Sequence, residues 1–414
     1  MEKEVVVIGL GYVGLPSVVN HVKKGHKVIG FDIDKRKVDL LNKGISHLDT
    51  VTDETVQMLK ANGTVFTYEE QLIREKDVYI IDVPTPIDKN KIPDLSYIKS
   101  AVELIKNKVK IGSLIILEST TYPGTTEEYL VAVFSKLGYT IGVDLFIAYS
   151  PERIDPGNTQ SLSAKIPRIV AGHTAECLSE AKLFFGSHVS SVSNLKTAEL
   201  AKIYENTFRL VNIALADELQ IISDDLSIDV YEVLEAAATK PFGFMKFTPS
   251  LGIGGHCIPV DPYYLTWLMG ARGVETPLIE TAGEINDSML DYYLNKIVAY
   301  IGKNHDKNLD KKLDEMKIAI LGITYKKNVA DTRMSSVISL IQKLKERNST
   351  IVVYDDILYS TTNITQNNVS RLEQKYHQLK EFDMVIYAVN HQLYEDNKAN
   401  IIRNSQLFYD LTLV

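Results

Sequence analysis

Residues 5–14 of the chain read Val-Val-Val-Ile-Gly-Leu-Gly-Tyr-Val-Gly. The leading run of β-branched residues predicts a strand that is buried on both faces of a parallel sheet. The glycines end this strand, a helical stretch follows to about Lys24, and Gly25 stands where a helix is expected to end. A second apolar run at residues 28–31 ends at Asp32. The chain therefore opens with a strand–helix–strand unit, which is typical of α/β proteins.

The remainder of the first 190 or so residues repeats this alternation. Apolar runs of strand length occur at residues 78–83, 113–118 and 146–148, and a stretch with helical periodicity occurs at residues 96–110. Strands separated by helices of this size predict a doubly wound sheet.

The middle of the chain is predicted to be helical. Between Asn194 and Asp225 polar and apolar residues recur every three or four positions, without proline or glycine, which indicates one long helix. Further helix is expected at residues 234–237 and 280–301. A polar, charged bridge follows at residues 302–316. After it the α/β alternation returns, at residues 318–322, 335–347, 350–354 and 384–388.

These patterns predict an α/β protein with two doubly wound, Rossmann-like domains joined by a long helical middle segment. The expected boundaries are residues 1–193, 194–302 and 303–414. A helix of this length is expected to act as a spine between the domains and to contribute to a subunit interface.

Composition excludes several classes of protein. The 414 residues are 45% hydrophobic and 24% charged, as in ordinary globular proteins, and the net charge of −8 argues against nucleic acid or an anionic membrane as partner. No apolar run reaches the roughly 18 residues of a spanning helix, and the N-terminus leads into a strand and not into a signal peptide. The two cysteines, Cys177 and Cys257, cannot build a disulfide scaffold or a cysteine zinc cluster, and no metal site is predicted. We expect a reducing, cytoplasmic location.

Gly9, Gly11 and Gly14 have the spacing G-x-G-x-x-G between the predicted strand and helix. In a dinucleotide-binding turn these glycines allow the tight turn, the approach of the pyrophosphate and close packing of helix on strand. Asp32 ends the second strand, where a carboxylate accepts hydrogen bonds from ribose hydroxyls and repels a 2′-phosphate. The alternative is a tight turn followed by an unrelated surface aspartate, but it would not require the glycine spacing, the strand–helix context and the aspartate together. The sequence therefore predicts NAD, and not NADP, as cofactor.

The most unusual stretch, residues 249–261, reads Pro-Ser-Leu-Gly-Ile-Gly-Gly-His-Cys-Ile-Pro-Val-Asp. Its clustered glycines carry no side chains, which would let a ligand lie against the backbone. The Cys257 thiol would then lie at that ligand, where it could add to an aldehyde, and the adduct could give up hydride to form a thioester. The alternative for a free cysteine is a small buried apolar residue, which is our interpretation of Cys177. For His256 we favour packing over tuning of the thiol.

Lys202, Asn206 and Arg209 share one face of the predicted long helix, because they are spaced by four and three residues. Such spacing usually indicates a solvated polar stripe. Only partner motifs elsewhere in the chain would give these side chains a functional meaning.

Partner motifs occur in order along nearly the whole chain. They are Gly-Leu-Gly-Tyr-Val-Gly-Leu-Pro at 9–16, Val-Pro-Thr-Pro at 83–86, Glu-Ser-Thr at 118–120, Ser-Pro-Glu-Arg-Ile-Asp-Pro-Gly at 150–157, Ala-Lys-x-x-Glu-Asn at 201–206, Gly-Gly-His-Cys at 254–257 and Gly-Ile-Thr-Tyr-Lys at 322–326. This set resembles the UDP-glucose/UDP-N-acetylhexosamine 6-dehydrogenase family. The resemblance implies an NAD domain and a UDP-binding domain that flank a long helix, and a homodimer built on that helix. It also implies oxidation of the sugar C6 alcohol to a carboxylate with two molecules of NAD.

The resemblance carries catalytic roles to matching positions. Cys257 corresponds to the nucleophile that holds a thiohemiacetal and then a thioester. Lys202 and Asp261 correspond to residues around the reacting oxygen, where a lysine cation would stabilise alkoxide charge. Glu152 and Thr120 correspond to the pair that positions the hydrolytic water, with Glu152 as the general-base candidate. The full catalytic set is Cys257, Lys202, Asp261, Glu152, Asn206 and Thr120.

The binding residues are assigned in the same way. The positions implied for the cofactor are Gly9, Gly11, Tyr12, Val13, Gly14, Asp32, Lys37, Thr85 and Thr120. The positions implied for the UDP-sugar substrate are Arg153, Ile154, Lys202, Asn206, Arg209, Phe247, Gly252, Tyr325, Lys326 and Arg333.

The motifs also bear on the sugar. Residues 150–157 and 240–244, the latter Lys-Pro-Phe-Gly-Phe, resemble the branch that oxidises N-acetylhexosamines. The Asp-Pro-Gly form at 155–157 is closer to enzymes for UDP-N-acetylglucosamine, or its galacto epimer, than for UDP-N-acetylmannosamine; UDP-glucose is a further alternative. In the last domain, Asp355-Asp356 stands where Asp-Pro is more usual, so the loop there is expected to differ.

Two other functions remain as alternatives. A single-step β-hydroxyacid-type dehydrogenase shares the NAD domain and a helical lysine but needs no cysteine. An inactive nucleotide-sugar sensor would not need Cys257, Lys202 and Glu152 together.

Overall fold

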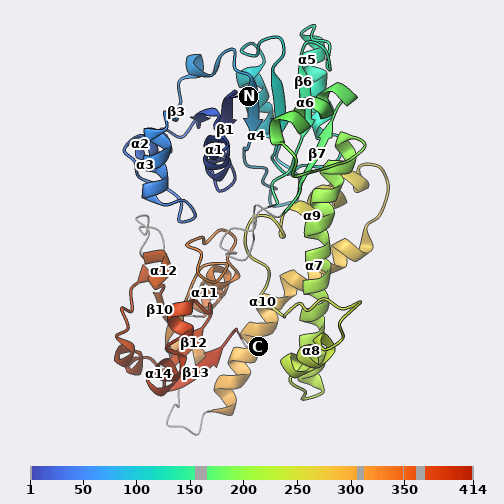
Figure 1. Ribbon diagram of the computed structural model, residues 1–414. Helices are drawn as coiled ribbons and strands as arrows, with labels where there is room; N and C mark the ends of the chain where they lie inside the picture. Colours follow the sequence, from blue (N-terminus) through green and yellow to red (C-terminus); the bar gives the residue numbers. More distant parts are fainter. Residues whose placement is uncertain (1, 154–165, 305–311, 348, 360–368, 413–414) are drawn as a thin grey trace. The chain divides into compact units, whose positions relative to one another are not determined.

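The computed structural model describes residues 2–153, 166–304, 312–347, 349–359 and 369–412. Two compact units make up the chain: Met1–Glu205 with Tyr263–Val274, and Asn206–Pro262 with Glu275–Val414. Each unit is built on its own sheet (Figure 1). The predicted fold class, with two Rossmann-like domains linked by a long helix, is confirmed.

The N-terminal sheet has eight strands in the order β3-β2-β1-β4-β5-β6-β7-β8. Neighbouring strands are parallel except β6 and β7, which are antiparallel. All residues of β4 and β5 are buried, which explains their continuous apolar sequences. The strands are β1 (Glu4–Ile8), β2 (Lys27–Phe31), β3 (Val65–Thr67), β4 (Val78–Ile81), β5 (Leu114–Leu117), β6 (Phe146–Tyr149), β7 (Arg168–Gly172) and β8 (Val189–Ser191).

The helices of this unit begin and end for local reasons. Gly25 has φ +83° and its N–H donates to the Val22 carbonyl, so it ends the first helix as predicted. The helix that begins at Ser96 ends at Ile105, and the Lys108 carbonyl beyond it accepts tertiary hydrogen bonds from the Glu75 N–H and the Tyr79 hydroxyl. The helical segments are α1 (Gly14–Lys23), α2 (Lys35–Asn42), α3 (Asp53–Ala61), η1 (Glu70–Ile73), α4 (Ser96–Ile105), η2 (Thr126–Val131), α5 (Ala132–Lys136), α6 (Ala175–Phe185) and α9 (Asp261–Gly270).

The predicted long helix is α7 (Leu195–Asp225), a continuous helix of 31 residues (Figure 1). Its first part belongs to the N-terminal unit and its second part to the C-terminal unit. Two other predicted helices are α8 (Val230–Ala238) and α10 (Pro277–Lys303). Pro277 lies in the first turn of α10, where its missing N–H removes no helical hydrogen bond.

The C-terminal sheet has five parallel strands in the order β11-β10-β9-β12-β13. The sequence predicted its three inner strands and missed its short edge strands β11 and β13. The strands are β9 (Lys317–Leu321), β10 (Thr350–Tyr354), β11 (Val369–Ser370), β12 (Met384–Tyr387) and β13 (Leu407–Asp410). The helical segments are η3 (Leu313–Glu315), α11 (Ser336–Glu346), α12 (Asp356–Tyr359), η4 (Tyr376–Glu381), α13 (Gln392–Glu395) and α14 (Lys398–Arg403).

Candidate functional site

The turn between β1 and α1 has the geometry of a nucleotide-binding turn. Gly9 has φ +95°, and a Cβ at this position would lie 2.4 Å from the Asp82 carbonyl oxygen. A Cβ on Gly14 would lie 1.8 Å from the Gly9 carbonyl oxygen. A Cβ on Gly11 would meet no atom within 4 Å. Gly9 and Gly14 are therefore required by packing, whereas Gly11 leaves open space beside its backbone.

Asp32 lies at the end of β2 and is held from two sides. Its carboxylate accepts hydrogen bonds from the N–H groups of Leu10 and Asp34, both at 2.9 Å. Lys37 Nζ lies 3.2 Å from the same carboxylate. Asp32 thus connects the glycine turn to the second strand and faces the lysine that was assigned with it.

Tyr12, Val13 and Thr85 are half-buried around this turn and the end of β4. Tyr12 packs against the apolar core of the unit, and Val13 precedes α1 without a side-chain cap. His47, which no sequence motif singles out, donates a hydrogen bond of 2.7 Å to the Leu10 carbonyl. Burial lowers the pKa of His47, so near neutral pH it is an uncharged support for the turn.

The glycines before Cys257 make close contacts within the C-terminal unit. Cβ atoms on Gly254 and Gly255 would lie 2.7 and 3.0 Å from the side chain of Tyr325. Gly252 has φ +119°, and its carbonyl accepts a hydrogen bond from the Ser336 hydroxyl. The loop therefore needs these glycines to pack against Tyr325 and α11, a reason that differs from the ligand approach expected from sequence.

Cys257 is half-buried, in the turn that leads into α9. Its carbonyl accepts hydrogen bonds from the N–H groups of Val260 and Asp261. The His256 side chain is exposed, and its Nδ1 lies 3.7 Å from the Cys257 sulfur. The expectation that His256 packs into the interior is therefore wrong, and the imidazole is within reach of the thiol. Cys177 is fully buried, as expected for an apolar packing residue.

Two of the assigned catalytic side chains are in direct contact. The Asn206 amide donates a hydrogen bond to the Asp261 carboxylate, and both residues are buried. Lys202 is half-buried one turn earlier in α7, whereas Arg209 is exposed. The polar face of α7 is thus not a uniformly solvated stripe, because Asn206 is buried against the start of α9.

Glu152 and Arg153 follow β6 in the N-terminal unit. The Arg153 N–H donates to Glu152 Oε1 at 2.6 Å, and Arg168 Nη2 lies 3.0 Å from Glu152 Oε2. The Arg153 guanidinium forms an ion pair with Glu205 of α7 at 2.6 Å. Thr120, which was assigned with Glu152, is half-buried after β5. Ile154 lies outside the described residues, as does the Asp-Pro-Gly segment.

Three of the assigned substrate residues, Tyr325, Lys326 and Arg333, lie in the segment between β9 and α11. Tyr325 contacts the cysteine loop, and the Lys326 carbonyl accepts a hydrogen bond from Thr324. The exposed Arg333 guanidinium is paired with Asp331, and its carbonyl accepts a hydrogen bond from the Gly255 N–H. Phe247 lies edge-to-face with Phe208 of α7, at 6.0 Å between ring centroids.

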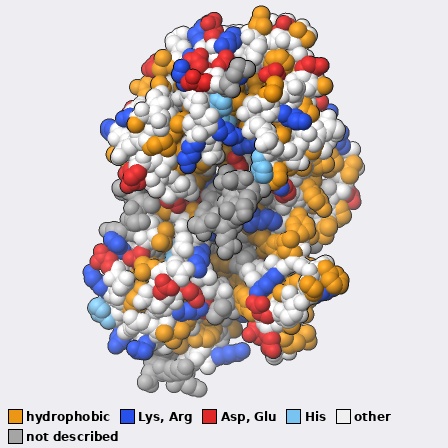
Figure 2. Space-filling model, in the orientation of Figure 1, with side chains coloured by type: hydrophobic (Ala, Val, Ile, Leu, Met, Phe, Trp, Pro, Cys, Tyr) orange, Lys and Arg blue, Asp and Glu red, His pale blue; other side chains and the backbone are white. Residues whose placement is uncertain are grey.

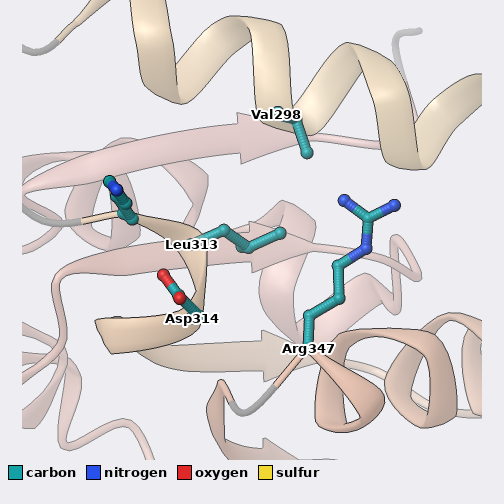
Figure 3. Close-up of a pocket in the computed structure, with 5 residues that line it drawn as sticks. Val298, Leu313, Asp314 and Arg347 are labelled. Carbon is teal, nitrogen blue, oxygen red and sulfur yellow. The ribbon is translucent and has the colours of Figure 1, made fainter.

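An open hollow in the C-terminal unit is lined by none of the assigned residues. Figure 3 shows Val298 of α10, Leu313 and Asp314 of η3, and Arg347 around it. Among the described residues, no group of three or more histidine, cysteine or acidic side chains is arranged to hold a metal ion. No helix in the described part of the chain is long and apolar enough to cross a bilayer.

Comparison with known proteins bears on the whole chain. Residues 3–186, 196–288 and 319–414 match the NAD binding, central and UDP binding domains of the UDP-glucose/GDP-mannose dehydrogenase family. The chain belongs to this family.

Individual relatives cover almost the full length. Protein CapL of Staphylococcus aureus is 37% identical, and the match covers 99% of this chain and 96% of the relative. The UDP-N-acetyl-D-glucosamine 6-dehydrogenase of Pseudomonas aeruginosa is 35% identical with the same coverage. The solved structure of UDP-D-ManNAc dehydrogenase from Pyrococcus horikoshii superposes with a TM-score of 0.87 at 29% identity, covering 99% of this chain and 96% of that one.

This member of the UDP-glucose/GDP-mannose dehydrogenase family is an NAD-dependent UDP-sugar dehydrogenase, and its N-terminal unit fits NAD. The open space at Gly11 leaves backbone N–H groups accessible to a pyrophosphate, and no side chain caps α1. The Asp32 carboxylate is positioned to accept hydrogen bonds from ribose hydroxyls.

Several contact residues of this UDP-sugar dehydrogenase could not be found from sequence. The buried Asp82 and Glu118 and the half-buried Arg168 lie around Glu152 and belong to different strand ends. Glu118 stands in the Glu-Ser-Thr motif, but Asp82 and Arg168 are single charged residues beside apolar strands and carry no motif of their own. Only the order of the strands brings these three side chains together.

Proposed function

We propose that this UDP-sugar dehydrogenase oxidises C6 of a UDP-N-acetylhexosamine, foremost UDP-N-acetylglucosamine, to the uronic acid through a thioester on Cys257. The observation that carries the proposal is the Cys257 loop: a half-buried thiol 3.7 Å from an exposed imidazole, on glycines packed against Tyr325. Relatives named for UDP-N-acetylglucosamine support the sugar. Others named for UDP-N-acetylmannosamine make that epimer the second candidate.

The first half of the reaction converts the alcohol to an enzyme-bound aldehyde. NAD held at the glycine turn would supply the hydride acceptor for each of the two oxidations at C6. Lys202 stabilises the alkoxide that forms as the C6 hydroxyl loses its proton. The Asp261 carboxylate accepts a hydrogen bond from the Asn206 amide, and we propose that both side chains lie beside the reacting oxygen.

The second half needs the sulfur and then water. The Cys257 thiolate adds to the aldehyde carbon, and loss of the second hydride leaves a thioester. Glu152, with Thr120, takes a proton from water as the water oxygen adds to the thioester carbon. The carbon–sulfur bond then breaks, which releases the acid and restores the thiolate. Because the sulfur must stay reduced, we also propose a reducing, cytoplasmic setting; Cys177 and Cys257 are not joined by a disulfide in the structure.

The binding roles follow the sequence assignments. We propose that residues 1–193 bind NAD, that residues 194–302 carry the cysteine loop, and that residues 303–414 bind the UDP moiety. Lys326 and the exposed Arg333 supply positive charge for the diphosphate. Phe247 and Arg209 are proposed to contact the substrate from the central segment.

We further propose a homodimer that buries one face of α7. Its second part exposes an apolar row at helical spacing, in which Leu215 is 63% exposed and Phe208 and Ile222 are 38% and 48% exposed. Leu226, directly after the helix, is 60% exposed. Figure 2 shows hydrophobic side chains gathered along the edge of the view where α7 and α8 lie in Figure 1. A second copy of the same helix face would cover this row.

The deciding experiment incubates the purified protein with NAD and, separately, UDP-N-acetylglucosamine, UDP-N-acetylgalactosamine, UDP-N-acetylmannosamine and UDP-glucose. We expect the highest kcat/KM with UDP-N-acetylglucosamine and about two NADH per acid formed. One NADH per sugar would favour the single-step alternative, and binding without NADH would favour the sensor. Cys257→Ser should abolish acid formation, and unimpaired turnover of this variant would refute the nucleophile assignment.

A further inference from the structure

A buried charged cluster lies behind Glu152 in the N-terminal unit. Asp82 follows β4, Glu118 follows β5, and Arg168 begins β7. Asp82 and Glu118 are 7% and 2% exposed. The Arg168 guanidinium donates a hydrogen bond to Glu118 through Nη1 and, at 3.0 Å, to Glu152 through Nη2. Arg168 therefore bridges an interior carboxyl group and the carboxylate proposed as the hydrolytic base.

Both oxygens of Glu152 are held by donors. Oε1 accepts the Arg153 N–H, and Oε2 accepts Arg168. The Arg153 guanidinium points instead to Glu205, with Nη2 and Nε at 2.6 and 3.2 Å from its carboxylate oxygens. The side chain that orients Glu152 is thus Arg168, although the neighbouring arginine is closer in sequence.

Arg168 is itself fixed in place. Its guanidinium carbon lies 4.7 Å from the centroid of the Phe185 ring. Lys24 Nζ lies 5.9 Å from the centroid of the same ring. A planar guanidinium stacked on a ring and hydrogen-bonded to two carboxyl groups has little freedom to rotate.

The pKa values of the two interior carboxyl groups are raised. Burial raises the pKa of Asp82 well above its usual value, and the neighbouring Glu118 raises it further. Burial also raises the pKa of Glu118 to about 7, although Arg168 opposes this. For two adjacent buried carboxyl groups, the state in which they share one proton is lower in free energy than the state in which both are ionised. Arg168 is therefore held by Glu118 on one side while it keeps its hydrogen bond to Glu152 on the other.

We propose that Arg168, anchored by the Asp82–Glu118 pair, is a positioning residue for thioester hydrolysis: it fixes the Glu152 carboxylate so that it can take a proton from the attacking water. This inference rests on the proposed function. The step is the addition of water oxygen to the thioester carbon, with one water proton passing to Glu152 and the carbon–sulfur electron pair leaving on Cys257. The proton on Glu152 then returns to the sulfur, and no oxidant is consumed.

The inference separates Arg168 from the hydride-transfer steps, which do not involve Glu152. Loss of Arg168 should leave both oxidations fast and make hydrolysis slow. The enzyme would then stop as the thioester after two hydride transfers. A role in folding alone would slow every step together.

The test uses the full-length enzyme with NAD and the best sugar from the substrate panel. Arg168→Met should give a burst of about two NADH per subunit, a steady-state rate lowered at least about 10-fold, and a UDP-sugar acyl adduct on the intact protein by mass spectrometry. Arg168→Lys, which keeps the charge, should recover part of the rate. Lys24→Met, which removes the other cation over Phe185, should give no adduct and near-normal turnover.

Other outcomes decide against the inference. If Arg168→Met turns over normally, or loses the burst together with the steady-state rate, the positioning role is wrong. Should that variant not fold, Glu118→Gln replaces it, with a smaller adduct expected and the absence of any adduct overturning the proposal. Glu152→Gln must also accumulate the adduct; if it does not, the proposed function of Glu152 fails instead. A wild-type enzyme that makes no NADH with any sugar removes the proposed function itself.

Discussion

The first strand of each sheet is followed by the same kind of glycine turn, but the residues around the two turns differ. In each, a glycine with positive φ follows the first strand, Gly9 at +95° and Gly322 at +85°, and its N–H donates to the last residue of the second strand. In each, an aspartate after the second strand accepts the next N–H: Asp32 from Leu10 at 2.9 Å, and Asp355 from Ile323 at 2.8 Å.

The surroundings of the two aspartates differ. Beside Asp32 stands Lys37, whose side chain is 35% exposed, and α1 begins within the glycine motif. Asp355 and His391 are both fully buried, with His391 Nε2 at 3.3 Å from the carboxylate, and α11 begins only at Ser336. The Asn328 N–H donates to His391 Nδ1, which ties down the intervening loop.

The comparison shows how one turn serves two purposes. In the N-terminal sheet we propose that the aspartate binds a ribose. In the C-terminal sheet the equivalent aspartate is a structural anchor, and we propose that a nucleotide there is bound by side chains of the loop, such as Lys326. The Asp355-Asp356 departure from the usual Asp-Pro is part of this anchor, because Asp356 accepts the Leu372 and Glu373 N–H groups.

The largest effect is expected from Gly14→Ala. Its Cβ would lie 1.8 Å from the Gly9 carbonyl oxygen, so the turn must open. We expect kcat/KM for NAD to fall at least about 100-fold, near 2.7 kcal/mol, together with a lower Tm. Gly11→Ala is the matched control: with no atom within 4 Å of its Cβ, it should keep the wild-type Tm and lose only NAD affinity.

A second experiment replaces each of the two aspartates, Asp32 and Asp355, with asparagine in a separate variant. Asp32→Asn removes the charge that faces the ribose, and we expect the KM for NAD to rise about 10- to 50-fold and NADP to be used better than by the wild type. Asp355→Asn should leave the KM for NAD unchanged and lower Tm. Equal effects of the two changes on the NAD KM would show that the turns do not differ as described.

Lys326→Ala examines the side-chain-based binding of the C-terminal loop. A phosphate contact remote from C6 contributes mainly uniform binding, so the KM for the UDP-sugar should rise about 5- to 10-fold with little change in kcat. Initial rates at saturating NAD provide the measurement. A loss confined to kcat would contradict this placement.

The smallest effect concerns pH. Burial opposes ionisation of Asp355, but hydrogen bonds from His391 and backbone N–H groups outweigh it and lower the pKa of Asp355 below its usual 3.8. Its stabilisation is therefore complete above about pH 4 and is lost as the pH falls through the lowered pKa. The unfolding free energy of wild type should exceed that of Asp355→Asn by about 1 kcal/mol at pH 7, and the gap should narrow near pH 3 in denaturant titrations.

Much of the fold could be predicted because inner parallel strands are uninterrupted apolar runs. Residues 78–81 and 114–117 are recognisable without any partner, and the absence of proline and glycine indicates the full length of α7. The edge strands β3, β8 and β11 have only two or three residues each, too few for a periodic pattern.

The candidate site was predictable only where a motif is local. The glycine turn, Asp32 and Cys257 stand in contiguous patterns. Arg168 pairs with Glu118 across 50 residues, so no window of sequence contains the interaction. The prediction for His256 was wrong because sequence gives a residue's neighbours along the chain but not its exposure.

The packing of Gly254 and Gly255 against Tyr325 has one more consequence. It fastens the sulfur to the unit that we propose holds the nucleotide end of the sugar, whereas the glycine turn belongs to the other unit. In the mechanism proposed above, a spent cofactor leaves and a fresh one arrives between the two hydride transfers, while the sugar stays bonded to Cys257 as the thiohemiacetal. Because the sulfur and the glycine turn belong to different units, the cofactor can be exchanged without breaking the bond between the sugar and Cys257.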